Sequence, residues 1–318
     1  MTRDGKKITA STAVMNLKPK FVWTVTGKTI TTMIRLLNGE QWDKNALLAK
    51  MLDDDFYYGH LGKHALSSSA IKLLQKSPKS YNNIVRKGKE QNSSALQIGT
   101  FIHTMVLEPH LFDERFQIID VQSRVAKSFK EGKAKSNKIV LTAKEHDDNM
   151  RIVDAAMRNT HIMDIIRGAE FEIPEIGMIE GYPFRAKADI FDKRFGFIAD
   201  LKTTREIENF KWSAEKFGYD IQAFIYTTLF ETSPEQFKFL AIDKASLDIG
   251  IFDVKPSFIN KGYAKLKEGI ENYKTFFEQH NDLDDYTLRG TLEWENSLCV
   301  SPKQGYAPPT HLSPNGEP

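Results

Sequence analysis

The chain has 318 residues, of which 41% are hydrophobic and 27% are charged, a composition typical of a globular protein with a full core. No stretch approaches the roughly 18 to 20 apolar residues of a membrane span, and the first residues lack the apolar core of a secretory signal. The single cysteine, Cys299, excludes a disulfide framework and an intramolecular four-cysteine metal site, so we expect an intracellular, cytoplasmic protein.

The formal net charge is only +2, but the basic residues are unevenly distributed. Residues 1–50 carry nine Lys or Arg against three acidic residues, and residues 121–144 carry seven against Glu131 alone. A basic segment in a near-neutral chain is typical of a surface that follows phosphates. It is equally typical of a solvated, mobile loop, and composition leaves both interpretations open.

The first 50 residues show no sustained periodicity apart from a candidate helix near residues 31–37. We interpret residues 1–56 as a basic, partly flexible N-terminal extension. Helical periodicity then predicts one helix over about 67–77, a second over about 94–107 and a third over about 143–167.

Three strands are expected next, near residues 170–179, 181–191 and 195–203. They are followed by a predicted helix over 210–231 and a strand over 237–243. Helices must then cover a central mixed sheet, which is an α/β arrangement.

The last predicted elements are a strand in L-D-I-G-I-F-D-V at 247–254 and an amphipathic helix over 258–280. From Ser301 the chain is too rich in proline and polar residues to pack, so we expect a disordered tail. One folded domain is therefore predicted over 57–300, with the tail at 301–318.

Residues 189 to 202, D-I-F-D-K-R-F-G-F-I-A-D-L-K, combine two aspartates with an Asp-x-Lys at the end of an apolar run. Alternation along a strand places Asp200 and Lys202 on one face. In the preceding run, Arg185, Lys187 and Asp189 share a polar face. A short polar turn joins the two runs, which predicts a hairpin with both acids on the same side.

Two carboxylates can hold Mg²⁺ or Mn²⁺, which prefer hard oxygen ligands, and a lysine two positions later can orient and deprotonate a water. The pattern thus favours metal-dependent phosphodiester hydrolysis. An acid-x-Lys at a strand edge is also common where the aspartates form turns and the lysine is solvated. The blocks on either side decide between these interpretations.

The arrangement helix, three strands, helix, strand around Asp…Asp-x-Lys resembles the core of the PD-(D/E)XK nuclease superfamily. Five blocks are similar to the RecE-like exonucleases (exodeoxyribonuclease VIII type) of phage and prophage recombination. They are L-S-S-S-A-I-K-L-L-Q-K-S-P-K-S-Y at 66–81, A-L-Q-I-G-T-F-I-H-T-M-V-L-E-P-H-L-F at 95–112, F-R-A-K-A-D at 184–189, I-A-D-L-K-T-T at 198–204 and F-G-Y-D-I-Q-A-F-I-Y at 217–226. The resemblance covers about residues 57–280. It departs from the superfamily's Pro-Asp pair, because Asp189 follows Ala188.

The resemblance implies that Asp189 and Asp200 are the metal carboxylates and that Lys202 positions the attacking water. The backbone carbonyl of Leu201 would add a ligand. His103 would approach the metal from the helix before the sheet, and Gly99 one turn earlier would let that helix face approach another backbone closely. The alternative for a lone helical histidine is a packed or solvated residue.

Many relatives also place a glutamate on the first strand, near a second metal. Glu172 fits this role best by its distance along the chain to Asp189, although two other glutamates are available at 170 and 175. Gln222 and Tyr226 are four residues apart on one helix face, where they could bridge the lysine and the DNA backbone. The alternative is a buried glutamine beside a core tyrosine.

Taken together, the resemblance implies an Mg²⁺-dependent exodeoxyribonuclease, for which Mn²⁺ is also suitable. It would degrade one strand of double-stranded DNA from an end, in the 5′→3′ direction. The remaining 3′ single strand would pass to an annealing protein for recombination. Relatives form rings, which implies a homo-oligomer, and a phage-encoded protein would act in the host cytoplasm.

Two other functions remain open at this point. One is a non-processive endonuclease of the same superfamily, and the other is a DNA-binding or annealing module with an inactive nuclease fold. An iron–sulfur nuclease is excluded by the single cysteine.

Overall fold

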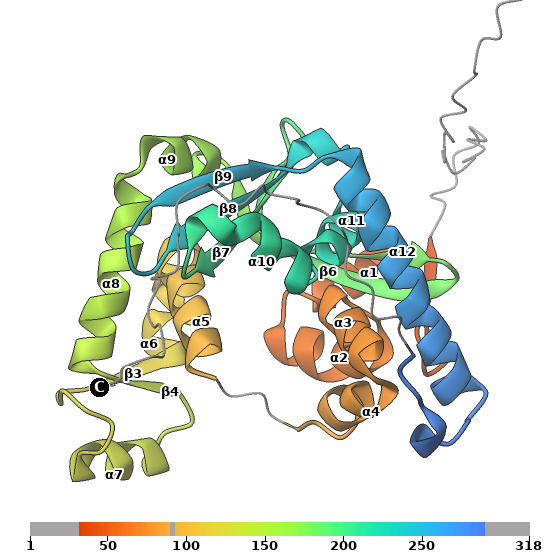
Figure 1. Cartoon of the computed structure of the whole chain (residues 1–318), viewed down its shortest axis with the longest axis horizontal. Coiled ribbons are helices and arrows are strands. Elements are labelled where there is room, and N and C mark those ends of the chain that lie inside the picture. Colours follow the sequence, from red (N-terminus) through yellow and green to blue (C-terminus); the bar gives the residue numbers. More distant parts are fainter. Residues whose placement is uncertain (1–31, 90–92, 290–318) are drawn as a thin grey trace, which may run out of the picture.

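The computed structural model describes residues 32–89 and 93–289 (Figure 1). The predicted tail at 301–318 and the first 31 residues of the predicted extension lie outside the described residues. No helix in the described ranges has both the length and the apolar character needed to cross a membrane.

A five-stranded sheet forms the centre of the molecule, in the order β5-β6-β7-β8-β9. Its strands are β5 Glu170–Ile179, β6 Tyr182–Asp192, β7 Phe197–Thr204, β8 Phe237–Asp243 and β9 Ile249–Asp253. Strands β7 and β8 are parallel, and the other neighbours are antiparallel. The predicted mixed α/β sheet is therefore confirmed.

Two groups of helices cover the two faces of the sheet, each with its own apolar core. One group is α3 Ser68–Lys76, α11 Tyr219–Leu229 and α12 Pro256–Tyr273; the other is α5 Ser94–Leu107, α8 Ala143–Arg158 and α9 Thr160–Ile166. In Figure 1, α5 and α8 lie on the left of the molecule and α3 lies on the right, below the strands. Where α11 meets α12, a Cβ added at Gly262 would lie 2.0 Å from the Asp220 carbonyl oxygen, so the close approach requires glycine.

Two of the predicted helices are each divided in two. The helix expected over 143–167 breaks at Asn159, whose side chain accepts a hydrogen bond from Ile162 N–H and so caps α9. The helix expected over 210–231 breaks at Gly218, which has a φ of 63° and separates α11 from α10, Phe210–Lys216. Local capping and a left-handed turn therefore override the continuous apolar periodicity.

The described part of the N-terminal extension is folded. The candidate helix near 31–37 is wrong: Met33–Arg35 is strand β1, paired with β2 Gln41–Asp43, and α1 Lys44–Lys50 follows. Alternation explains the strand, because Ile34 and Leu36 are buried whereas Met33 and Arg35 are exposed. Together with Leu47 they form a third core that includes Ile176 of β5. Residues 32–50 are thus packed against the sheet instead of forming an arm.

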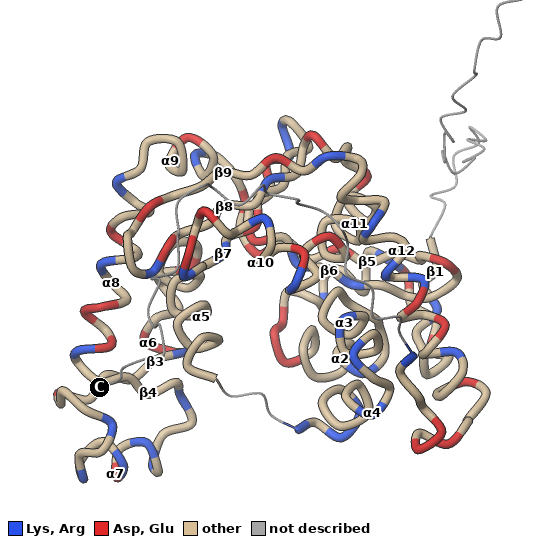
Figure 2. The backbone as a smooth tube through the Cα atoms, in the orientation of Figure 1, with Lys and Arg blue, Asp and Glu red and all other residues tan. Residues whose placement is uncertain are grey.

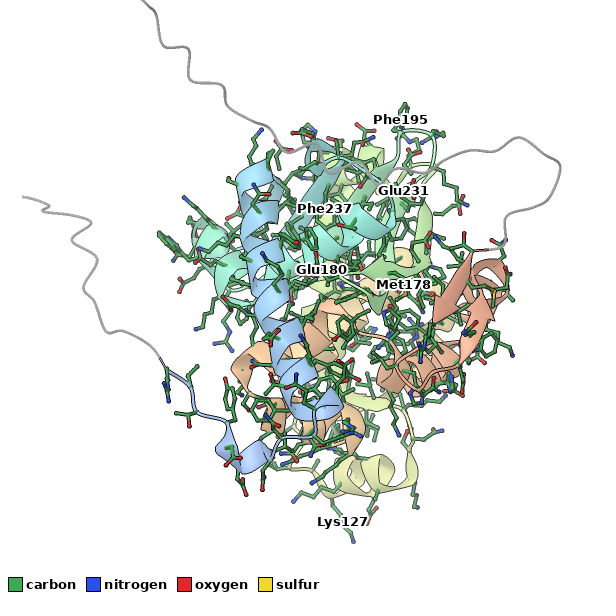
Figure 3. All side chains as sticks on the ribbon, turned by 90° about the vertical axis from the view of Figure 1, so that its right-hand side faces the viewer. Lys127, Met178, Glu180, Phe195, Glu231 and Phe237 are labelled. Carbon is green, nitrogen blue, oxygen red and sulfur yellow. The ribbon has the colours of Figure 1, made fainter. Side chains whose placement is uncertain are left out.

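A small lobe contains the basic segment at 121–144. Strand β3, Phe116–Ile119, pairs in parallel with β4, Ile139–Thr142, and the crossover between them contains helix α7, Lys127–Lys135. These elements were not predicted, and a helix stands where one interpretation assumed a loop. Figure 2 shows the lysines spread along α7, and Lys127 points away from the body at the edge of the molecule in Figure 3.

The other helical segments are short. They are η1 Asp55–His60, α2 Leu61–His64, α4 Pro78–Tyr81, η2 Asn82–Arg86, η3 Pro109–Leu111, α6 Phe112–Arg115, η4 Ile207–Asn209, η5 Pro234–Gln236, η6 Lys274–Glu278 and η7 Leu283–Asp285.

Candidate active site

A cavity of about 1260 Å³ lies between the two groups of helices and the sheet. Its wall includes six of the predicted site residues: His103, Glu172, Asp189, Leu201, Lys202 and Tyr226. They come from α5, β5, β6, β7 and α11, so segments far apart in the sequence meet around one space.

Asp189 lies where strands β6 and β7 separate. The last paired residues of their ladder are Ile190 and Ala199, and one step further Oδ2 of Asp189 accepts a 2.8 Å hydrogen bond from the Leu201 N–H. Asp189 itself is only 8% exposed. The predicted hairpin is confirmed, and a side chain replaces main-chain pairing at its open end.

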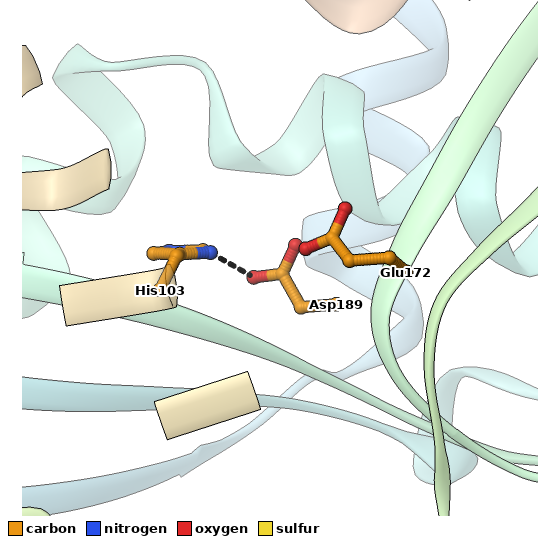
Figure 4. A group of neighbouring side chains, drawn as sticks. All are labelled: His103, Glu172 and Asp189. Carbon is orange, nitrogen blue, oxygen red and sulfur yellow. Dashed lines mark ion pairs between the residues drawn. The ribbon is translucent and has the colours of Figure 1, made fainter. Parts of the chain in front are cut away.

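His103 reaches both strands from α5. Its Nε2 lies 2.7 Å from the Leu201 carbonyl oxygen, and its Nδ1 lies 3.5 Å from Oδ2 of Asp189 (Figure 4). A carbonyl oxygen only accepts hydrogen bonds, so Nε2 carries the proton and a neutral ring turns the lone pair of Nδ1 toward Asp189. Nδ1 of His103 and Oδ2 of Asp189 are then two hydrogen-bond acceptors that face each other, and a proton or a cation between them would relieve their repulsion.

The expectation about Gly99 is wrong. A Cβ at this position would meet no atom within 4 Å, so no backbone approaches the helix there. Gly99 instead lines the cavity, one turn before His103.

Glu172 completes a group with His103 and Asp189 in which one ligand atom from each residue lies within 4.8 Å of the others. Glu172 lies opposite Asp189, between the paired positions Phe171↔Ile190 and Ile173↔Ala188. Its φ of 51° is uncommon for a residue other than glycine, and such strained positions cluster at functional sites.

The other two candidate glutamates of β5 are engaged elsewhere. Glu170 pairs with Lys193 at 2.7 Å, and Glu175 pairs with Lys44 at 2.9 Å. Of the three glutamates, the structure brings Glu172 to the aspartate.

Asp200 lies on the opposite side of β7 from Leu201 and is completely buried. Its Oδ1 accepts a 2.5 Å hydrogen bond from Nε2 of Gln222, and its Oδ2 forms an ion pair with Nζ of Lys202. The Lys202 ammonium also lies 5.1 Å from the centre of the Tyr219 ring. The predicted common face of Asp200 and Lys202 is confirmed.

Gln222 and Tyr226 make contacts other than the predicted bridge to the lysine. Gln222 holds the carboxylate of Asp200, and the Tyr226 hydroxyl donates a 2.9 Å hydrogen bond to the backbone carbonyl of Lys187. Both side chains are buried, so they fix the positions of groups on β6 and β7.

The carboxyl groups of Glu172 and Asp200 resist ionisation, because both are buried and both lie near the charge of Asp189. Burial, followed by the charges of Asp189 and Glu108, raises the pKa of Glu172 to about 8. Burial and then Asp189 raise the pKa of Asp200 to about 6, against the opposing charge of Lys202. Burial alone would lower the pKa of Lys202, but Asp200 and Asp189 hold it above its ordinary value. Lys202 is therefore a cation here, able to donate a hydrogen bond but not to accept a proton.

The residues present fit a divalent metal ion. Carboxylate oxygens, one imidazole nitrogen and a main-chain carbonyl form a donor set suited to Mg²⁺ or Mn²⁺. A cation would also offset the crowded carboxylates and the facing acceptors of His103 and Asp189.

Sequence reasoning did not predict that two other polar residues of β6 are buried and line the cavity. Arg185 and Lys187 are less than 10% exposed and line the cavity, and the Tyr57 ring lies 4.3 Å from the Arg185 guanidinium carbon and 4.5 Å from Nζ of Lys187. Lys187 also pairs with Asp54 at 2.5 Å. Strand alternation on β6 had already placed Arg185 and Lys187 on the same face as Asp189. The neighbouring sequence did not indicate that this face is buried.

Comparisons with known proteins give one family and several structures. A family model described as a PDDEXK-like domain of unknown function (DUF3799) matches residues 67–283. No curated protein matches the sequence. A crystal structure named "putative exonuclease", from Eubacterium rectale, aligns over 76% of this chain and 95% of its own, with 16% identity and a TM-score of 0.56. A phage related exonuclease from Haemophilus somnus 129PT aligns over 68% and 96%, with 15% identity and a TM-score of 0.31. At 16% identity, the first of these similarities establishes a shared fold.

Proposed function

Because the chain belongs to the family of PDDEXK-like domains of unknown function (DUF3799), we propose that it is a metal-dependent exodeoxyribonuclease. It hydrolyses phosphodiester bonds of double-stranded DNA, starting from an end. The observation that carries the proposal is the meeting of His103, Glu172 and Asp189 in one cavity with Lys202. Acids, an imidazole and a lysine around one space are what metal-assisted hydrolysis requires.

We assign the metal ligands to the carboxylates of Asp189 and Asp200, the backbone carbonyl of Leu201, and the side chains of His103 and Glu172. The carbonyl oxygen of Leu201 has a second lone pair beyond the one that His103 engages. When bound, Mg²⁺ or Mn²⁺ supplies the positive charge that activates water and stabilises the leaving oxygen.

The protein's own groups orient the reaction. The Lys202 ammonium, held between Asp200 and the Tyr219 ring, donates hydrogen bonds to the attacking water or to a phosphate oxygen. Gln222 keeps the Asp200 carboxylate in one orientation, and Tyr226 fixes the backbone of β6 at Lys187. These two residues act by positioning the groups that do the chemistry.

Two observations support DNA as the substrate: the cations of β6 and the five sequence blocks that resemble RecE-like exonucleases. Lys187 and Arg185 place two cations on the strand that carries Asp189, where they can contact the phosphates of a DNA strand. The likeness to RecE-like exonucleases supports 5′→3′ degradation, a 3′ single strand for recombination and an annealing protein as partner. It also supports a ring of several copies around the DNA.

Two other functions use the same fold. A non-processive endonuclease would cut within a strand, and an inactive module would bind DNA without hydrolysis. Asp189 and Lys202 line the cavity, and the buried Asp200 forms an ion pair with Lys202, which disfavours an inactive module.

Linear and covalently closed circular DNA, each incubated with Mg²⁺, distinguish the three functions. The exonuclease should degrade linear DNA progressively and leave the circle intact, and a chelator should stop the reaction. Cutting of the circle would indicate the endonuclease. Binding without any hydrolysis would indicate the inactive module. The Asp200→Asn variant is the control for a contaminating nuclease, because it should be inactive in both assays.

A further inference from the structure

Phe217 is an aromatic side chain in the wall of the cavity that contains the proposed metal ligands. It is 53% exposed, although most of the large aromatic residues around it are packed into the core. A single exposed apolar residue on an outer surface needs no explanation. A phenyl ring beside charged catalytic groups is different, because it offers a flat apolar face inside a polar cavity.

The ring lies close to the proposed site of hydrolysis. Its centre is 6.1 Å from the centre of the Tyr219 ring, which in turn lies 5.1 Å from Nζ of Lys202. At a rise of roughly 3.4 Å per nucleotide in a duplex strand, these two steps span no more than about three nucleotides. Phe217 is therefore within reach of the bases next to the bond that is cut.

The backbone holds Phe217 in place. It caps the C-terminus of α10, and its N–H donates a 2.9 Å hydrogen bond to the Ser213 carbonyl. Gly218 then turns the chain with a φ of 63°, and a Cβ added there would lie 3.2 Å from the side chain of Lys72. A ring presented from a fixed turn loses little conformational freedom when a ligand packs on it.

The charge next to the ring suits a nucleic-acid strand. Lys216 lines the same wall, with its Nζ 6.0 Å from the centre of the Phe217 ring. The preceding acid, Glu215, forms an ion pair with Lys261 of α12. An aromatic ring with a cation beside it is the arrangement that binds single-stranded DNA by base stacking and phosphate contact.

We propose that Phe217 stacks on an unpaired nucleobase at the DNA end, within a few nucleotides of the bond that is cut, while Lys216 contacts the adjoining phosphate. The inference rests on the proposed function for the identity of the ligand. Every base offers a π face, so this contact holds an opened end without regard to sequence.

The test measures binding separately from hydrolysis. The ligand is a fluorescent hairpin duplex whose free end carries three unpaired nucleotides on each strand, and affinity is measured by anisotropy in a chelator. Phe217→Leu removes the ring and keeps an apolar side chain, whereas Phe217→Tyr keeps the ring. Phe195→Leu is the matched control, because Phe195 is 68% exposed at the β6–β7 turn and lies outside the cavity wall (Figure 3).

We expect Phe217→Leu to bind roughly 5- to 150-fold more weakly, since stacking contributes about that factor per base. Phe217→Tyr and Phe195→Leu should bind within about twofold of the unmodified protein. An abasic site is then moved through the unpaired nucleotides. At the stacked position it should weaken binding by the unmodified protein and abolish the difference from Phe217→Leu.

Three outcomes would overturn the inference: unchanged binding by Phe217→Leu, an equal loss in Phe217→Tyr, or no abasic position that removes the difference. Hydrolysis of the same hairpin with Mg²⁺ is measured in parallel. No hydrolysis by the unmodified protein, with the expected abasic pattern, would contradict the nuclease and support stacking. Normal hydrolysis with unchanged binding by Phe217→Leu would contradict stacking alone.

Discussion

The carboxylate of Asp189 is held by the backbone of Leu201, whose N–H donates a 2.8 Å hydrogen bond to Oδ2. The contact joins β6 to β7 just beyond their last paired residues. The carbonyl of Leu201 is engaged by His103, so both polar groups of one peptide unit take part in the site. Two functions are thus combined in Asp189, which closes the end of a hairpin and supplies a proposed metal ligand.

The first prediction follows from this double role. Asp200→Ala and Asp189→Ala should each abolish hydrolysis, because either change removes a carboxylate from the proposed metal site. Asp189→Ala should also lower the free energy of unfolding by about 1 to 3 kcal/mol, since the Leu201 N–H loses its acceptor. Asp189→Asn keeps an oxygen acceptor and should recover stability without activity. Hydrolysis rates and denaturant titrations on the same preparations test this, and normal activity of Asp200→Ala would refute the proposed site.

A second prediction concerns Lys202, which pairs with the buried Asp200. Lys202→Met keeps the volume of the side chain and removes the charge. Turnover should fall by roughly 10²- to 10⁴-fold, the range for a positioned proton donor or acceptor. The Mg²⁺-induced rise in melting temperature should persist, because the carboxylates remain. If Lys202→Met lost both turnover and the Mg²⁺-induced rise in melting temperature, Lys202 would instead be required to hold the metal ligands in place.

Replacement of His103 separates a role at the metal site from a packing role. His103→Ala should reduce hydrolysis severely and change the melting temperature little, because the ring is 28% exposed at its side chain and contacts polar groups of the site. His103→Asn, which retains a polar side chain, is the companion variant. A large fall in melting temperature with activity preserved in the folded fraction would assign His103 to packing.

The fourth prediction is a pH dependence of the metal-free protein. Burial and neighbouring charge raise the pKa of Glu172 from its ordinary value of 4.5 to about 8, so the folded state binds a proton that the unfolded state has lost. Stability should therefore be greatest at low pH within this window and fall between about pH 5 and 8, by up to about 1.4 kcal/mol per pH unit.

Glu172→Gln should flatten this dependence, since glutamine does not titrate. Melting temperatures in a chelator between pH 5.5 and 8.5 make the comparison, and added Mg²⁺ should restore stability at the alkaline end. A slope that is equal in both proteins would show that other groups cause the loss.

The fifth prediction tests the basic helix α7. Neutralising the four lysines 127, 130, 133 and 135 should weaken DNA binding without regard to sequence, and the slope of log affinity against log salt should fall by roughly 0.9 per lost contact. Turnover at saturating DNA should change little, because none of these lysines lines the cavity. Neutralising Lys267 of α12 and Lys274 of η6 is the control for a loss of charge elsewhere, because α12 and α7 lie on opposite sides of the molecule (Figure 1). An unchanged salt slope would make α7 a solvated helix.

Local pattern was sufficient for most of the elements around the site. Alternation of polar and apolar residues predicted β6 and β7, and helical periodicity predicted α5 over the residues that it occupies in the structure. The same alternation placed Asp200 and Lys202 on one face of β7, where the structure has them. These features depend on residues that are close in sequence, so the periodicity of polar and apolar residues is sufficient to predict them.

Other features needed the tertiary structure. The choice of Glu172 over the glutamates at 170 and 175 depends on a left-handed backbone at Glu172 and on Lys193 and Lys44, which come from distant segments. The burial of Lys187 depends on Tyr57, 130 residues earlier in the chain. No local pattern contains these partners.

By itself, the sequence determined the order of the helices and strands that carry the site and which of its residues could perform hydrolysis. Only the tertiary structure decided which of those residues share one cavity, because His103 and Leu201, 98 residues apart, meet through the packing of α5 on β7. The physical reason is that periodicity reflects the burial of one face of an element, whereas a site requires side chains from several elements to converge. Which side chains converge depends on which faces pack together, and that packing joins elements that are far apart in the sequence.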